Sequence, residues 1–319
     1  MALILSGSLA FDRFMSYPGV YADSIIPEKI HQLNLSFLMN KSKRVYGGTA
    51  GNIGYNLKLL NEKPLIATSL GDDPDGCDYR RRFIDWGFPL TAVKTHPGHL
   101  TASCLIATDR NKNQLTFFHP GAMLESSGFD PTTLPPPYDA HLAIISAGGP
   151  EEMKSLSTAY RHLGCRFICD PGQQIHVFSK DELLDLAEGA FIFTCNEYEF
   201  ELFKKITGLD LEGLFQLVQA VVITRGEKGC DLLVPGRGSQ HITPVPVSQV
   251  NNPTGAGDAF RAGLIKGLAQ GEHLITACRL GATIASFCVE TDGTQEHSFT
   301  LPQVIARHLA AFKEQLALN

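Results

Sequence analysis

The segment from Asn252 to Gly263 combines two glycines with a carboxylate at the start of a predicted helix. Gly255 and Gly257 let the backbone turn tightly and leave room for an anion to reach bare peptide N–H groups. The helix expected over residues 257–269 directs its positive end to the same place. Asp258 alone would repel phosphate, so its position makes sense if it accepts a proton from a hydroxyl group while the N–H groups hold the charge on a phosphoryl group. The structural alternative is a glycine-rich turn with Asp258 as a favourable first-turn residue.

A second glycine-rich segment has four glycines within the eight residues from Gly47 to Gly54, ahead of helical spacing over Tyr55–Leu60. These glycines permit a ligand to approach the backbone closely, and Asn52 offers a donor and an acceptor to a diol. A structural turn explains the segment equally well. The chain contains no G-x-G-x-x-G dinucleotide fingerprint and no Gly-Lys dipeptide, which excludes a P-loop.

Two shorter segments follow the ends of apolar strands. Asn196 and Glu199 stand three residues apart where a strand enters a helix, so their side chains share one helical face. Together they could hold a hydrated Mg²⁺, which prefers oxygen ligands and keeps most of its waters. An N-cap asparagine followed by acidic first-turn residues is the structural alternative. The segment Ile223–Gly229 predicts a strand, a turn and a second strand.

The composition is that of an ordinary soluble globular chain, with 319 residues, 44% hydrophobic side chains and a formal net charge of −6. This mildly acidic balance argues against a face that binds duplex nucleic acid, which needs a dense basic patch. No stretch approaches the ~20 apolar residues of a membrane span, and the N-terminus lacks the basic region of a signal peptide. The eight cysteines show no CxxC pair and no metal-ligand spacing. We therefore expect buried, reduced thiols in a cytoplasmic protein.

Short apolar runs alternate with helical segments, the pattern of an α/β fold with a parallel sheet. We expect strands at residues 3–8, 141–146, 165–170, 190–194 and 220–224, and helices at residues 151–163, 257–269, 275–289 and 301–316. Two stretches break this rhythm. Residues 18–46 have no long helical period, and residues 103–108 and 114–118 predict a hairpin around polar turn residues. Both stretches are expected to form a small β subdomain that projects from the α/β body.

Together and in this order, the four segments resemble the ribokinase-like (pfkB) carbohydrate kinase family. Its two signature regions match residues 47–54, with Gly71–Asp73 following, and residues 252–263. Its Asn-x-x-Glu and Thr-Arg-Gly-x-x-Gly motifs match residues 196–199 and 224–229. Further segments look like the bacterial adenosine kinase branch of the family, namely residues 7–12, 18–19, 27–28, 31–37, 113–114, 118–123, 170–174 and 293–296.

The resemblance implies a three-layer α/β/α sandwich with a mostly parallel central sheet and a small β-sheet lid. It also implies one kinase domain over residues 1–319, in which the lid is discontinuous and covers approximately residues 13–46 and 99–120. The implied reaction is ATP-dependent phosphorylation of the 5′-hydroxyl of a nucleoside. Adenosine is the first candidate, with AMP and ADP as products, and the implied cofactors are ATP and Mg²⁺.

The resemblance assigns a role to each motif residue. Asp258 is the base, and the anion hole consists of Gly255, Ala256 and Gly257. The residues that bind the ribose hydroxyls are Asp12, Gly48 and Asn52, and those around the nucleoside are Ser8, Ser36, Phe118, Gln173 and Gln174. Asn196 and Glu199 organise the waters of Mg²⁺, and the residues that border ATP are Asn196, Thr224, Gly226 and Gly229.

The sequence departs from the family pattern in two places, at Asn252 and at the pair Ser103 and Cys104. Family members usually have an acidic residue six positions before the base, in a loop linked to monovalent-cation binding; here it is Asn252, which leaves K⁺ activation open. Ser103 and Cys104 occupy positions where an aromatic ring would stack on a purine. A sugar or sugar-phosphate kinase of the same fold is therefore an alternative, with Arg13 and Arg44 as candidates for binding a phosphate. A catalytically silent nucleotide-binding regulator is a third, although such a protein has no use for the base.

The predicted lid also suggests that the protein pairs with a second copy of itself. It would leave the edge of an open sheet uncovered, and natural proteins cover such edges. In the branch that this sequence resembles, two lids cover each other, so we expect a homodimer through the lids. The expected partners are thus a nucleoside or sugar, ATP and a second copy of this chain, and neither nucleic acid nor a membrane.

Overall fold

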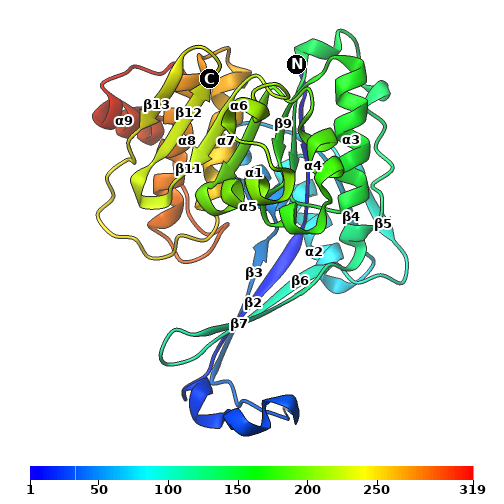
Figure 1. Cartoon of the computed structure of the whole chain (residues 1–319), viewed down its shortest axis with the longest axis vertical. Helices are drawn as coiled ribbons and strands as arrows, with labels where there is room; N and C mark the ends of the chain where they lie inside the picture. Colours follow the sequence, from blue (N-terminus) through cyan, green and yellow to red (C-terminus); the bar gives the residue numbers. More distant parts are fainter. Residues whose placement is uncertain (33, 319) are drawn as a thin grey trace.

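The computed structural model describes residues 1–32 and 34–318 and shows an α/β body from which a narrow β-sheet projects (Figure 1). Within the described residues the body contains a nine-stranded sheet in the order β13-β12-β11-β10-β9-β8-β1-β4-β5. From β11 to β5 the strands are parallel, whereas β12 and β13 are antiparallel to their neighbours. The bounds are Leu3–Ser6 (β1), Leu65–Gly71 (β4), Val93–His96 (β5), Leu142–Ser146 (β8), Arg166–Asp170 (β9), Ile192–Asn196 (β10), Val221–Thr224 (β11), Cys230–Val234 (β12) and Gly238–Ile242 (β13).

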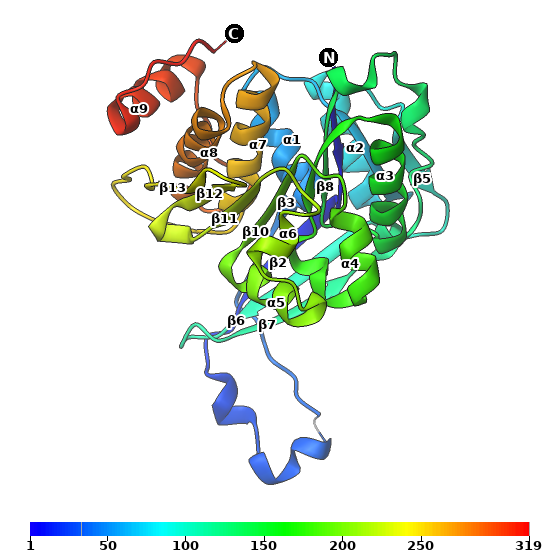
Figure 2. The same ribbon diagram turned by 45° about the horizontal axis from the view of Figure 1, so that its top comes forward.

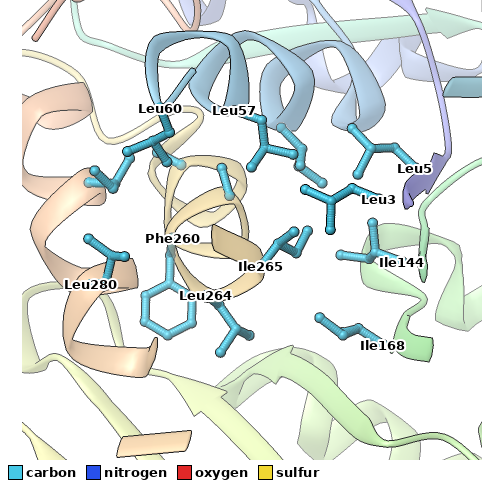
Figure 3. Packing of buried hydrophobic residues seen from close by; sticks show 14 of the residues in the cluster. Leu3, Leu5, Leu57, Leu60, Ile144, Ile168, Phe260, Leu264, Ile265 and Leu280 are labelled. Carbon is cyan, nitrogen blue, oxygen red and sulfur yellow. The ribbon is translucent and has the colours of Figure 1, made fainter. Parts of the chain in front are cut away.

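Helices cover both faces of this sheet (Figure 2). Along β1 the side chains alternate between two hydrophobic clusters: Leu3 and Leu5 pack toward α1, α2, α7, α8 and α9, and Ile4 packs toward α3 to α6. Figure 3 shows the first cluster, in which Leu5 and Ile265 lie between the sheet and the helices. The predicted α/β/α sandwich is thus confirmed. The helices are Thr49–Leu59 (α1), Pro74–Trp86 (α2), Pro150–Leu163 (α3), Lys180–Ala187 (α4), Glu197–Thr207 (α5), Leu211–Leu214 (α6), Ala256–Ala269 (α7), Leu274–Val289 (α8) and Leu301–Phe312 (α9).

The projecting sheet, which we call the lid, has the strand order β3-β2-β6-β7. Its strands are Ala10–Ser16 (β2), Lys41–Gly47 (β3), Ala102–Thr108 (β6) and Gln114–His119 (β7). Strands β6 and β7 form the predicted hairpin, and β2 lies parallel to β6 and antiparallel to β3. Residues 17–32 and 34–40, between β2 and β3, lie beyond the outer end of the lid in both ribbon views. They contain two short helical segments, Tyr21–Ser24 and Pro27–Gln32. The expectation that residues 18–46 belong to the β subdomain is therefore wrong for the described residues before Lys41, where β3 begins. The division into one kinase domain with a lid at residues 13–46 and 99–120 remains our proposal.

Two predicted helix bounds differ from the structure by more than one residue. Helix α1 begins at Thr49 and not at Tyr55, because the Ser8 hydroxyl accepts a hydrogen bond from the Thr49 N–H at 3.0 Å and caps the helix there. Asn52 therefore lies in the first turn of a helix and not in a loop. Helix α9 ends at Phe312 because the next residue, Lys313, takes a left-handed conformation with φ of +56°.

The cysteines are all free, but their expected burial is wrong at two positions. Cys77 is exposed and Cys104 is partly exposed, whereas the other six are buried. Cys104 lies on lid strand β6, which has less protein around it than the body strands have. Among the described helices, none is long and apolar enough to cross a bilayer.

Candidate active site

Predicted site residues from several segments lie at the carboxyl ends of the parallel strands, the edge at which α/β sheets bind ligands. Asp170 is the last residue of β9, Asn196 the last of β10 and Thr224 the last of β11. Helix α7 packs against α1, and Asn52 Nδ2 donates a hydrogen bond of 2.8 Å to Asp258 Oδ2. This bond joins the two glycine-rich segments, which lie 206 residues apart in the sequence.

The N-terminus of α7 offers open backbone donors. Gly255 precedes the helix with φ of +85°, a conformation that favours glycine. The Ala256 N–H donates to the Pro253 carbonyl at 3.2 Å. In the part of the chain that the structure describes, the N–H groups of Gly257 and Asp258 have no acceptor, as is usual in the first turn of a helix. Of the three residues of the predicted anion hole, Gly255 and Gly257 therefore have open N–H groups among the described residues, while that of Ala256 is already engaged. The N–H group of Asp258 is a further open donor beside them.

Asp258 has the properties of a base that works near neutral pH. Burial raises the pKa of its carboxyl to about 7, although Arg261 and the hydrogen bond from Asn52 lower it, and the carboxylates of Asp170 and Asp12 raise it further. No Lys, Arg or His of the described residues forms an ion pair with Asp258. A carboxylate with this pKa can accept a proton from a hydroxyl group more readily than an ordinary aspartate can.

Arg261 lies one helical turn after Asp258 and is buried. Its Nε and Nη2 atoms contact the two carboxylate oxygens of Asp170, which is also buried. Its Nη1 atom lies beside Gly257, where an added Cβ would be only 2.7 Å away. Burial opposes the charge of Arg261, but the carboxylates of Asp170 and Asp258 outweigh it and raise the pKa of the guanidinium above its ordinary value. The arginine thus places a permanent positive charge next to the predicted anion hole.

Asp12 lies on lid strand β2 and is also close enough to Asp258 to raise its pKa. Burial raises the pKa of the Asp12 carboxyl itself to about 6. Cys104 is the register partner of Asp12, and Phe118 is the register partner of Cys104. Register partners share one face of a sheet, so these three side chains lie on the same face of the lid. The Phe118 ring is 49% exposed, which leaves it accessible to a ligand on this face.

Three of the residues predicted to bind substrate also have structural roles: Ser8, Gly48 and Asn52. The Ser8 hydroxyl caps α1. Gly48 has φ of +84°, and a Cβ there would lie 2.5 Å from the Ser8 carbonyl oxygen, so the chain needs glycine at this position. Asn52 Oδ1 accepts a hydrogen bond of 3.0 Å from Gln295 Nε2, and one Nδ2 hydrogen goes to Asp258. The other Nδ2 hydrogen of Asn52 has no acceptor among the described residues.

The other residues predicted around the nucleoside lie in two different places. Gln173 and Gln174 belong to the short helical segment Gly172–Val177, directly after Asp170, with Gln173 exposed and Gln174 partly buried. Ser36 is exposed and belongs to the segment between β2 and β3. Among the described residues, no hydrogen bond joins Ser36 to Asp258.

Asn196 and Glu199 form a capping box at the start of α5. Asn196 Oδ1 accepts from the Glu199 N–H, and Glu199 Oε2 accepts from the Asn196 N–H, both at 2.8 Å. The structural alternative for this motif is therefore realised. The box leaves the second oxygen of Glu199, in the first turn of α5, for other partners, and a carboxylate oxygen of this kind fits a hydrated Mg²⁺.

The turn between β11 and β12 contains the residues predicted to border ATP. It has the predicted strand-turn-strand form, and Thr224 Oγ1 donates to the Cys195 carbonyl at 3.4 Å. Gly226 and Gly229 both have positive φ, at +56° and +88°. The turn thus follows β11 at the same edge of the sheet as Asn196.

Four residues near Asp258 were given no role from the sequence: Tyr79, Asp170, Arg261 and Gln295. Arg261 is the one that spacing could have suggested, because it stands three residues after Asp258 and shares its helical face. The other three belong to distant segments, and the sequence holds no local signal of their contacts.

Comparison with known proteins places the chain in a family. The model of the pfkB family carbohydrate kinases matches residues 15–301. A nucleoside kinase of Methanocaldococcus jannaschii is 28% identical to this chain over 88% of its length and 91% of that protein. The structure of a Burkholderia thailandensis nucleoside kinase in complex with inosine has a TM-score of 0.87 and 33% identity, covering 98% of this chain and 99% of that one.

A ribokinase of Thermotoga maritima has a TM-score of 0.80 at 19% identity, covering 96% of this chain and 99% of that one, and so shares the fold. The predicted ribokinase-like fold is thereby confirmed. Because the family model matches most of the sequence, this chain belongs to the pfkB family of carbohydrate kinases and is a phosphotransferase that acts on a hydroxyl group.

Proposed function

We propose that this protein is an ATP-dependent nucleoside kinase that phosphorylates the 5′-hydroxyl group, with adenosine as its first acceptor. The observation that carries the proposal is the pairing of a near-neutral carboxylate with open N–H groups. Asp258, with a pKa of about 7, lies in the same helical turn as the free N–H groups of Gly257 and Asp258 itself. A proton acceptor and an anion site are thus less than one helical turn apart.

The chemistry asks for little covalent work, because a loose phosphoryl transition state is stabilised mainly by positioning and charge. Asp258 accepts the proton of the attacking hydroxyl group late, once that oxygen has become acidic. The N–H groups of Gly257 and Asp258, with Arg261 beside them, stabilise the phosphoryl oxygens. Mg²⁺, held through water by Asn196 and Glu199, would neutralise charge on the phosphates of ATP. Thr224, Gly226 and Gly229 would border the nucleotide.

Ion pairs on the lid argue against a phosphorylated sugar as acceptor. Arg13 Nη2 lies 2.9 Å from Asp75 Oδ2, and Arg44 Nη2 lies 2.8 Å from both Asp75 Oδ1 and Asp78 Oδ2. The Arg44 guanidinium also lies 3.7 Å from the centre of the Phe11 ring. Both arginines proposed as phosphate ligands are therefore already neutralised by carboxylates of α2, which favours an uncharged acceptor.

The lid supports an acceptor that carries an aromatic base. Phe118 lies on the same face of the lid as Asp12 and is half exposed. It supplies the aromatic ring that Ser103 and Cys104 lack, two strands away from Asp12. A ribose held by Asp12 would place its base toward Phe118, where stacking on a ring contributes about 0.5–1.5 kcal/mol beyond buried area.

Measurement of ADP release across a panel of acceptors tests the proposal. The panel contains adenosine, inosine, guanosine and cytidine against ribose, fructose and fructose phosphates, with Asp258→Asn as the inactive control. We expect turnover with nucleosides and the highest kcat/KM with adenosine. If kcat/KM were higher with inosine than with adenosine, inosine would become the assigned acceptor and the protein would still be a nucleoside kinase. Turnover with phosphorylated sugars alone would refute the proposal.

A further inference from the structure

A chain of buried hydrogen bonds leads from the backbone to Asp258. Tyr79, on α2, is fully buried, and its hydroxyl donates to the Gly47 carbonyl. Gln295 Nε2 lies 3.0 Å from the Tyr79 hydroxyl oxygen and 3.0 Å from Asn52 Oδ1. Asn52 Nδ2 then donates to Asp258 Oδ2 at 2.8 Å. Gln295 and Asn52 are only 4% and 5% exposed, so water does not compete for these bonds.

The direction of every bond in this chain follows from its first member. A hydroxyl group has one proton, and Tyr79 gives it to the Gly47 carbonyl, so its oxygen can only accept from Gln295. Gln295 must therefore present its NH₂ group, whose second hydrogen goes to Asn52 Oδ1. With its oxygen occupied, Asn52 presents its own NH₂ group to Asp258.

We infer that Tyr79 and Gln295 are positioning residues, which fix Asn52 as a hydrogen-bond donor to Asp258 and so hold the base in its charged, proton-accepting form. The inference deepens the proposed function, since it concerns the same base. Neither residue touches the reacting atoms. They act through Asn52, whose amide would otherwise be free to turn over.

The two donor bonds of Gln295 Nε2 hold its amide in this orientation. Its Oε1 is buried without a hydrogen-bond partner among the described residues, which is a cost that these two bonds must outweigh. Two further hydrogen bonds hold the segment that contains Gln295 against α1. His297 Nε2 bonds Asn56 Oδ1 at 2.8 Å, and Asn56 Nδ2 donates to the Asn52 carbonyl at 2.9 Å.

The opposite orientation would disable the base. If Asn52 turned its amide over, its oxygen would face Asp258 Oδ2, and two oxygens can share a hydrogen bond only when one carries a proton. Asp258 would then keep its proton and could not accept another. The titratable groups that surround Asp258 are Arg261 on its own helix, Asp170 on β9, Asp12 on β2 and Cys288 on α8. Among the described residues, neither Tyr79 nor Gln295 forms a hydrogen bond or ion pair with any of these four groups.

Two substitutions by uncharged residues test the inference, so that no added charge changes the pKa of Asp258. Tyr79→Phe removes the group that sets the direction, and Gln295→Met removes both donors at similar volume. The measurements are the dependence of kcat on pH and a ¹³C NMR titration of the Asp258 carboxyl, identified by its absence in Asp258→Asn. We expect the acid limb of kcat and the carboxyl titration to move to higher pH by about one unit in Gln295→Met, equivalent to a tenfold weaker acid, and by a smaller step in Tyr79→Phe.

Tyr160→Phe is the matched control. Tyr160 is also fully buried, but its hydroxyl makes no hydrogen bond in the described residues, so its removal should leave both titrations in place. Unshifted titrations in Tyr79→Phe would overturn the inference, even if kcat fell, because a merely structural role lowers the rate without moving the pKa. If Gln295→Met fails to fold, Tyr79→Phe decides alone. A wild-type protein that phosphorylates no nucleoside would refute the proposed function instead, and the NMR titration would still decide the role of Tyr79.

Discussion

The charge of Arg261 sets how far burial can raise the pKa of the base, and Arg261→Met tests this directly. The substitution leaves Asp170 buried without its bidentate partner. Breaking a buried pair in this way destabilises a protein by about 3–5 kcal/mol, because the remaining charge is uncompensated. Asp258 also loses a nearby cation, and such a cation lowers a carboxyl pKa by about 1–3 units. The pKa of Asp258, about 7 in the wild type, should therefore rise.

The sign of the effect on activity follows from the role of Asp258. A base with a higher pKa is more fully protonated at neutral pH, so the kcat of Arg261→Met should fall there and recover as the pH rises. The assay is kcat against pH with saturating ATP and nucleoside, together with urea unfolding at pH 7. An acid limb that stays at its wild-type position would refute the tuning role of Arg261.

The double variant Arg261→Met/Asp170→Asn separates charge from packing. It removes a cation that lowers the pKa of Asp258 and a carboxylate that raises it. We therefore expect its acid limb to return toward the wild-type position and its free energy of unfolding to recover in part. If the double variant kept the acid limb of Arg261→Met, the effect would come from altered packing of α7 and not from charge.

Other outcomes follow from the same geometry. Because burial raises the pKa of Asp258 from 3.8 to about 7, its stabilising contribution is complete below pH 3.8 and is lost as the pH rises through 7. Urea unfolding should thus find Asp258→Asn more stable than the wild type by about 1–4 kcal/mol at pH 8 and equally stable near pH 3.5. Asn252 Nδ2 donates to Asp292 Oδ1 at 3.0 Å, and its Oδ1 accepts from the Thr254 N–H at 2.9 Å. With both ends of this amide engaged, we expect the same rate in K⁺, Na⁺ or choline chloride, and a response to K⁺ only in Asn252→Asp. The open edge strand β7 carries Phe117, which is 62% exposed. Light scattering should show a dimer through the lids at micromolar concentration and a monomer for Phe117→Glu; a monomeric wild type would contradict the proposed dimer.

The sequence was sufficient where the chemistry lies in consecutive residues. Gly255, Gly257 and Asp258 are neighbours, so the turn, the helix start and the carboxylate could be predicted together. The same holds for the strands, whose apolar runs reflect burial on both faces of the sheet. Asn196 and Glu199 show the limit of such local patterns, because the spacing fits a helix cap and a metal site equally well.

The supporting contacts could not be predicted because their partners are far apart in the sequence. Arg261 and Asp170 are separated by 91 residues, and Gln295 and Asn52 by 243. Each of these side chains is polar and buried, and only the folded chain shows which partner compensates it. Ser36 illustrates the opposite case, since this residue, taken from the resemblance, lies in the segment between β2 and β3 and forms no hydrogen bond with Asp258 among the described residues.

The kcat of Asp258→Asn at saturating ATP and nucleoside tests the central claim most directly. An amide at this position can still accept the hydrogen bond from Asn52, so the site keeps its shape, but it cannot take a proton from the hydroxyl group. We predict that kcat falls by about 10²–10⁴-fold, the usual contribution of a positioned base, and that the Kd of the nucleoside changes little. An unchanged kcat would contradict the account, because the proton would then leave by a route that does not involve Asp258.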